Sequence, residues 1–128
     1  LPDADVEQLR KDIEEQVKQS ISNAQRDIYL RIQDVVSHMA DKLANYDPTA
    51  SSRKDKGFFR NSLVDNVRDL CTLIPSLNVT DDPNLAHVLK DLEQVTRYDA
   101  EDLRKDGMLR KDTAKDAQRI LDQIKDYM

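Results

Sequence analysis

Apolar or small residues recur every three or four positions along the first third of the chain. Residues 3–46 contain neither Gly nor Pro. The recurring positions have a mean spacing of about 3.6 residues, the period of a straight α-helix, whereas a left-handed heptad coil requires 3.5. The pattern therefore predicts one long helix over residues 3–46. Its stripe comprises Val6, Leu9, Ile13, Val17, Ile21, Ala24, Ile28, Ile32, Val35, Met39, Leu43 and Tyr46.

An unbroken helix of this kind is longer than its own domain is wide. At 1.5 Å per residue it extends about 66 Å, whereas a compact globule of this chain length is roughly 36 Å across. The part that projects must have its apolar stripe covered by a second copy, by another protein, or by the remaining helices laid lengthwise. The alternative is a break near the polar residues Gln19, Ser20, Ser22 and Asn23, with the two halves folded back as a hairpin.

The pattern changes after residue 46. Residues 47–57 open with an Asp-Pro pair and lack apolar periodicity, so they predict an exposed loop that ends the long helix. A second stripe over residues 59–74 predicts a helix that stops at Pro75. In the connector that follows, Leu77 and Val79 are expected to enter the core.

Two further helix signals complete the chain. Asp82 is placed to cap a helix whose first position is Pro83, and apolar residues then recur at helical spacing. After a short turn, Gly107 is expected to follow a helix end as a C′ residue. The last helix is predicted over residues 108–127.

Composition supports an all-α fold. The chain has 128 residues, of which 35% are charged and 5% aromatic, and it contains only two Gly. These values are typical of helical proteins and argue against most sheet folds. We therefore expect a single domain over residues 1–128: an elongated helical bundle with one long N-terminal helix and three or so shorter helices within residues 58–128.

The best candidate for a functional surface is the part of the long stripe that the shorter helices leave uncovered. We expect these helices to gather near the far end of the long helix. This predicts a non-enzymatic protein–protein interaction module or a self-assembling structural module, whose partner is another protein or a homo-oligomer. The candidate partner-binding residues are Val6, Leu9, Ile13, Val17 and Ile21.

Charge adds a weaker candidate. The net charge is −5, and only the segment around the predicted loop is basic. Its Arg53, Lys54, Lys56 and Arg60 could contact an anion or an acidic partner, or could be ordinary charges on a solvated connector. Four cations diluted by Asp55 are fewer than the broad face that nucleic-acid binding requires.

Several kinds of chemistry lack their usual residues. Gly57 and Gly107 stand apart, so there is no phosphate-binding glycine loop. His38 and His87 lie on different predicted helices without the companions of a zinc or di-iron site. We therefore expect no catalytic residue, no cofactor and no metal. Cys71 is the only cysteine, which favours the cytoplasm, and no apolar run is long enough to cross a membrane.

One stretch resembles a known family. "FRNSLVDNVRDLCTLIPSLNVTDDPNL" followed by "YDAEDLRKD", within residues 58–106, is similar to an uncharacterised bacterial and phage helical family with a helix, a Leu-Pro-x-Leu-Asn-like turn and an acidic helix start. Here the turn residues are Ile74 to Asn78. Some relatives are encoded near MoxR-type AAA+ ATPases, so the resemblance implies, as an alternative function, an adaptor or cofactor of such an ATPase.

Overall fold

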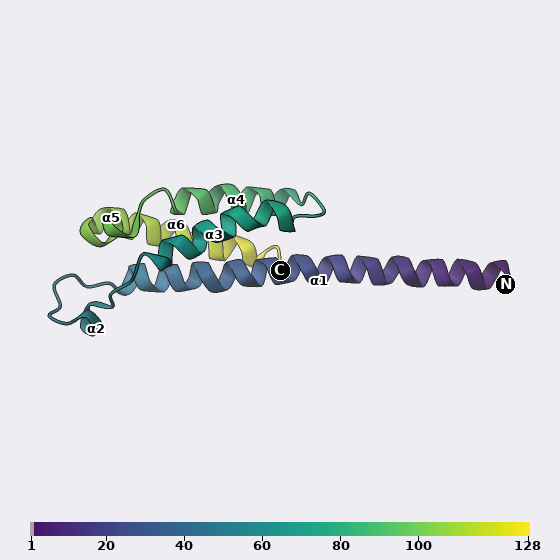
Figure 1. Cartoon of the computed structure of the whole chain (residues 1–128), viewed down its shortest axis with the longest axis horizontal. Helices are drawn as coiled ribbons and strands as arrows, with labels where there is room; N and C mark the ends of the chain where they lie inside the picture. The colour runs from purple at the N-terminus through teal and green to yellow at the C-terminus, as the bar shows by residue number, and fades with distance from the viewer. Residues whose placement is uncertain (1) are drawn as a thin grey trace.

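A computed structural model describes residues 2–128 as an all-α chain (Figure 1). No strand occurs within these residues, as the composition predicts. The elements are α1 (Asp3–Asn45), α2 (Arg53–Lys56), α3 (Ser62–Leu77), α4 (Pro83–Val95), α5 (Ala100–Lys105) and α6 (Gly107–Lys125).

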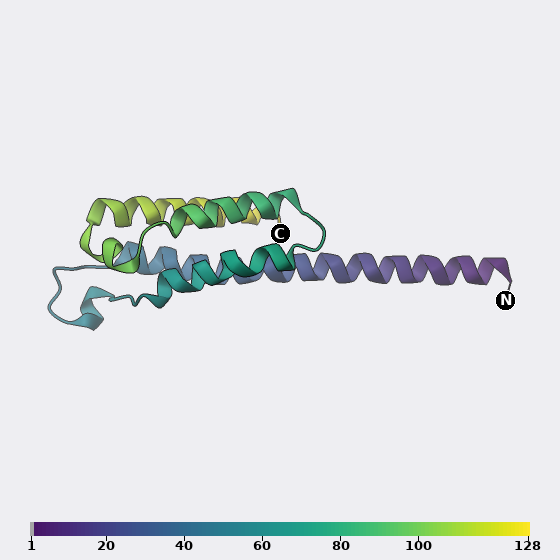
Figure 2. The same ribbon diagram turned by 45° about the horizontal axis from the view of Figure 1, so that its top comes forward.

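The first helix is continuous, and half of it stands clear of the other helices. α1 spans 43 residues, about 65 Å at the standard rise. Figures 1 and 2 show its N-terminal half extending away from the rest of the molecule. The long-helix prediction is confirmed and the hairpin alternative is wrong. Residues 19–23, although polar apart from Ile21, include no Gly or Pro to interrupt the backbone hydrogen bonds.

The second half of α1 belongs to a four-helix bundle. It packs against α3 and α6, and α4 packs against the same two helices from the opposite side. The chain runs along α1, returns along α3, and repeats this through α4 and α6, so neighbouring helices are antiparallel (Figure 2). Antiparallel neighbours joined by short connections are the usual topology of such bundles.

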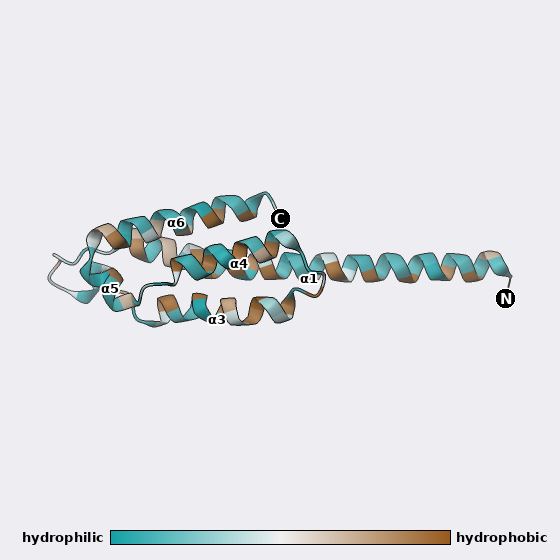
Figure 3. Ribbon diagram, turned by 90° about the horizontal axis from the view of Figure 1, so that it is seen from above, coloured by the Kyte–Doolittle hydropathy of each residue, from teal (hydrophilic) through white to brown (hydrophobic). Residues whose placement is uncertain are grey.

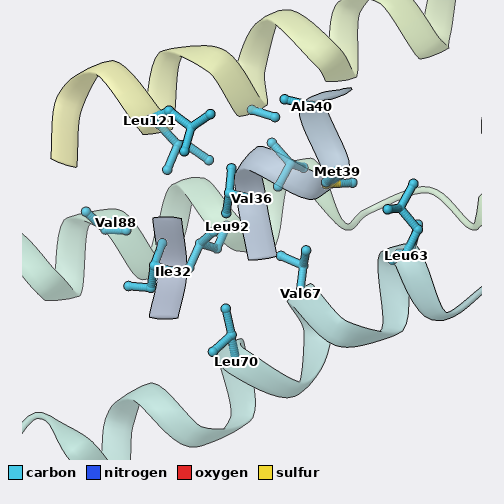
Figure 4. Close-up of a cluster of buried hydrophobic side chains, with 14 of the residues drawn as sticks. Ile32, Val36, Met39, Ala40, Leu63, Val67, Leu70, Val88, Leu92 and Leu121 are labelled. Atoms are coloured by element: carbon cyan, nitrogen blue, oxygen red, sulfur yellow. The ribbon is translucent and has the colours of Figure 1, made fainter. Parts of the chain in front are cut away.

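The core lies where the four helices face one another. Ile32 and Val36 of α1 are fully buried, as are Val67 of α3 and Leu92 of α4. Figure 4 shows these side chains converging with Leu121 of α6. Every buried residue of α1 lies between Ile28 and Leu43, so only this half of the helix contributes to the core.

Two helix boundaries differ from the sequence prediction. α3 continues through Pro75 to Leu77, because a proline in the last turn removes one backbone hydrogen bond while the Asn78 N–H still donates to the Ile74 carbonyl at 2.9 Å. Gly107 follows the end of α5 as a C′ residue, as predicted, but it also begins α6, one residue earlier than expected. Asp106 caps that helix by accepting a hydrogen bond from the Leu109 N–H at 3.1 Å.

The predicted loop over residues 47–57 contains one turn of helix, α2. Ser52 caps it by accepting from the Asp55 N–H at 3.1 Å. Gly57 closes it in the left-handed region, with φ of 64°, where a glycine avoids the strain of a side chain. Most of the segment is exposed, as predicted.

Candidate interaction surface

The N-terminal half of α1 is the largest uncovered feature of the fold. We call residues 3–20 the projecting segment, because every one of them is exposed. Coverage begins at Ile21, which is half-buried, and the first buried side chain is that of Ile28. The shorter helices therefore gather at the far end of α1, as the sequence predicts.

Four large apolar side chains lie along the projecting segment, and we call them the apolar stripe. Their spacing of three or four residues places them on one face of the helix, and Figure 3 shows apolar positions recurring between hydrophilic ones along this part of α1. The predicted fifth member, Ile21, lies at the edge of the bundle. The exposed fractions are 49% for Val6, 56% for Leu9, 52% for Ile13 and 53% for Val17.

The stripe leads into an apolar notch where α1 enters the bundle. The notch is a cavity of about 340 Å³ lined by side chains from α1 and from the end of α3. Val79 is 76% exposed there, so its predicted place in the core is wrong: the backbone turns outward after Leu77, which packs against the core. The lining residues are Ala24, Asp27, Ile28, Arg31, Ser76, Leu77 and Val79.

Polar contacts fix the connector between α3 and α4 on α1 beside the notch. The Gln25 side chain donates to the Thr80 hydroxyl at 2.6 Å. The Tyr29 hydroxyl donates to the Asp82 carboxylate at 3.0 Å, which also caps α4 through the Asn84 N–H. The pKa of the Tyr29 phenol is raised, mainly by burial and to a lesser extent by this hydrogen bond. These contacts hold the start of α4 at the point where α1 leaves the bundle.

The predicted cationic residues are only partly brought together. Arg53 and Arg60 line one open cavity of about 530 Å³, whose lining also includes Phe58 and Arg104 but neither predicted lysine, Lys54 or Lys56. Phe58 lies against two guanidinium groups, with Arg53 4.7 Å and Arg104 5.3 Å from its ring centroid.

Arg104 was missed by the sequence analysis. It also donates to the Phe59 carbonyl at 3.0 Å. It comes from α5, more than 40 positions further along the chain, so no local pattern connects it with the basic segment.

Other reactive side chains remain separate from one another. His38 and His87 are both exposed, on α1 and α4. Burial raises the pKa of the Cys71 thiol to about 11, so the thiol is neutral near pH 7. Within residues 2–128, no three His, Cys, Asp or Glu side chains are grouped so as to hold a metal ion.

Comparisons of the chain with protein-family models, with curated proteins and with solved structures find no match. The resemblance of residues 58–106 to a bacterial and phage family stays a prediction. No helix within residues 2–128 has both the length and the apolar character needed to span a membrane.

Proposed function

We propose that this chain is a non-enzymatic helical module that makes protein–protein contacts through the apolar stripe of its projecting segment. The partner is either a further copy of the chain, which makes it a self-assembling element, or a different protein. An adaptor role beside a MoxR-type AAA+ ATPase is one form of the second alternative. The single cysteine, which has no partner for an internal disulfide, supports a cytoplasmic setting.

The observation that carries the proposal is the exposed apolar stripe on a helix that its own domain does not cover. In proteins most of the stability of a helix comes from packing its apolar face, not from helix propensity. About half of each stripe side chain is exposed. Burying the exposed half of four such side chains contributes about 3 to 6 kcal/mol. A partner therefore gains substantially by covering this face.

The test is the substitution Ile13→Asp, which places a charge in the middle of the stripe. Gln8→Asp is the matched control, because it introduces the same charge on the opposite face of the same helix. Oligomer mass is measured by light scattering and binding to candidate partners by affinity capture, with and without ATP. Circular dichroism verifies that both variants keep their helix content.

We expect Ile13→Asp to shift the oligomer toward the monomer mass of 14.8 kDa, or to weaken partner affinity at least tenfold, and Gln8→Asp to leave both nearly unchanged. Recovery of an ATP-dependent AAA+ ATPase that Ile13→Asp fails to bind would identify the adaptor alternative. If mass and binding are the same in wild type and Ile13→Asp, the proposal is wrong.

A further inference from the structure

We propose that the projecting segment is covered by the same segment of a second copy, running antiparallel, so that the first turn of each helix reaches the other copy's notch. This inference rests on the proposed function and commits it to one partner. It follows from the spacing of the stripe, the position of α3 and the area left exposed.

The apolar positions from the tip of α1 to the notch are spaced symmetrically. The stripe together with Ile21 and Ala24 has successive intervals of 3, 4, 4, 4 and 3 residues. This order is the same from either end. Two identical antiparallel helices require such symmetry if each apolar residue of one copy is to face an apolar residue of the other. With the two-fold axis at residue 15, Val6 faces Ala24, Leu9 faces Ile21, and Ile13 faces Val17 of the second copy. A heterologous partner imposes no such symmetry.

The position of α3 excludes the parallel arrangement. α3 lies along α1, and its end shares the notch with Ala24 and Ile28, which continue the face of the stripe. If two copies paired in parallel through this face, both α3 helices would lie between the two α1 helices, whose axes must approach to about 8–10 Å. Figure 2 shows α3 ending where the projecting part of α1 begins, so in an antiparallel pair the second helix would lie in line with α3 and end at the notch.

The uncovered area is sufficient for a dimer. The chain exposes 8590 Å², whereas a compact monomer of 14.8 kDa is expected to expose about 7,000 Å². The excess of roughly 1,600 Å² is about twice the area that each partner contributes to a standard interface. The symmetric pair therefore needs only part of this excess.

Charge makes a distinctive prediction for a second copy. The projecting segment carries six acidic and three basic residues, so two copies repel each other weakly. At the ends, this register places Asp3 of the acidic first turn opposite Asp27 in the notch of the second copy, which adds to the repulsion. Because salt screens the net repulsion over a Debye length of about 10 Å at 0.1 M, self-association should strengthen with salt. Binding of a basic partner, in contrast, would weaken as the salt concentration rises.

The test uses spin labels at Gln8→Cys, Glu15→Cys and Ser22→Cys, one per chain, in a Cys71→Ala background. These positions are exposed and seven residues apart on the face opposite the stripe, so the labels leave the contact intact. Distances between labels are measured by electron paramagnetic resonance at high protein concentration. Unlabelled Cys71→Ala chains are first verified by circular dichroism and by mass.

In an antiparallel pair the two labels are closest when they are at position 15. At position 8 or 22 the two labels are also displaced along the helix axis by about 21 Å, so their separation is larger. Equal distances at all three positions would indicate a parallel pair and overturn the inference. A chain that stays monomeric at every concentration and salt level would also overturn it. If in that case Ile13→Asp still abolishes binding to a different protein, the proposed function stands and only the second copy is wrong.

Discussion

Two isoleucines of α1, one buried and one exposed, provide the sharpest test of which part of this helix is packed in the bundle. Ile32 is fully buried and Ile13 is 52% exposed, although both are interior residues of α1. Replacement of either by Ala changes helix propensity by the same few tenths of a kcal/mol. Ile32→Ala also leaves a cavity among four helices and should lower the free energy of unfolding by about 2 to 5 kcal/mol. Ile13→Ala should change it by less than about 0.5 kcal/mol in the monomer.

The assay is urea unfolding followed by circular dichroism, at a protein concentration where sedimentation shows a monomer. A domain of this size usually unfolds in one cooperative step, so the two variants can be compared through their midpoints and a common slope. At higher concentration Ile13→Ala should lose stability relative to wild type, because the contact it weakens then contributes. A loss above about 1 kcal/mol for monomeric Ile13→Ala would mean that the projecting segment packs on the bundle, and would refute the account.

Two further predictions concern the ends of the bundle. Because the folded chain raises the pKa of Tyr29 above the unfolded value of about 10, the phenol ionises first in the unfolded chain, and stability should fall as pH rises above about 10. Between pH 8 and pH 10.5 the urea midpoint should decrease less in Tyr29→Phe than in wild type. An equal decrease in both would contradict this. Gly57→Ala should cost about 1 to 2 kcal/mol, since φ is positive and the new Cβ would lie 2.9 Å from the Asn45 carbonyl oxygen. Thermal unfolding tests this against Gly107→Ala, whose Cβ would meet only the flexible end of Arg110 and should be nearly neutral.

The sequence predicted the long helix and its uncovered half for clear physical reasons. Residues 3–46 contain no helix breaker and keep one apolar period throughout, so both the element and its length follow from local rules. Val6, Leu9, Ile13, Val17 and Ile21 were predicted as contact residues because the shorter helices were expected to gather at the far end of α1 and leave this part uncovered. The structure leaves the first four exposed and Ile21 half-buried; that they contact a partner stays a prediction.

Other features could not be predicted because they depend on which local signal prevails. Pro75 is a strong helix-end signal, yet α3 passes through it. Gly107 follows the end of α5, as its signal predicts, but α6 begins at the same residue. In the second case Asp106 competes with the glycine and acts as an N-cap.

The periodicity of the sequence carries no information on how the elements pack in three dimensions. It could not show that the chain turns outward at Val79, nor that Arg104 lies beside Phe58. The notch combines α1 with the end of α3, so it has no signature within either helix.

The most direct test of the central claim, that the projecting segment meets a second copy, is amide hydrogen exchange at increasing protein concentration. In the dilute monomer, residues 3–20 should exchange quickly, since an uncovered helix opens readily, and residues 28–43 should be protected by the bundle. As concentration rises, protection should grow in residues 3–20 and around the notch that the second copy reaches, and it should stay unchanged in residues 32–43. Ile13→Asp should remove the growth. If exchange in residues 3–20 stays fast at every concentration, or if new protection develops on the bundle away from the notch, the claim is wrong.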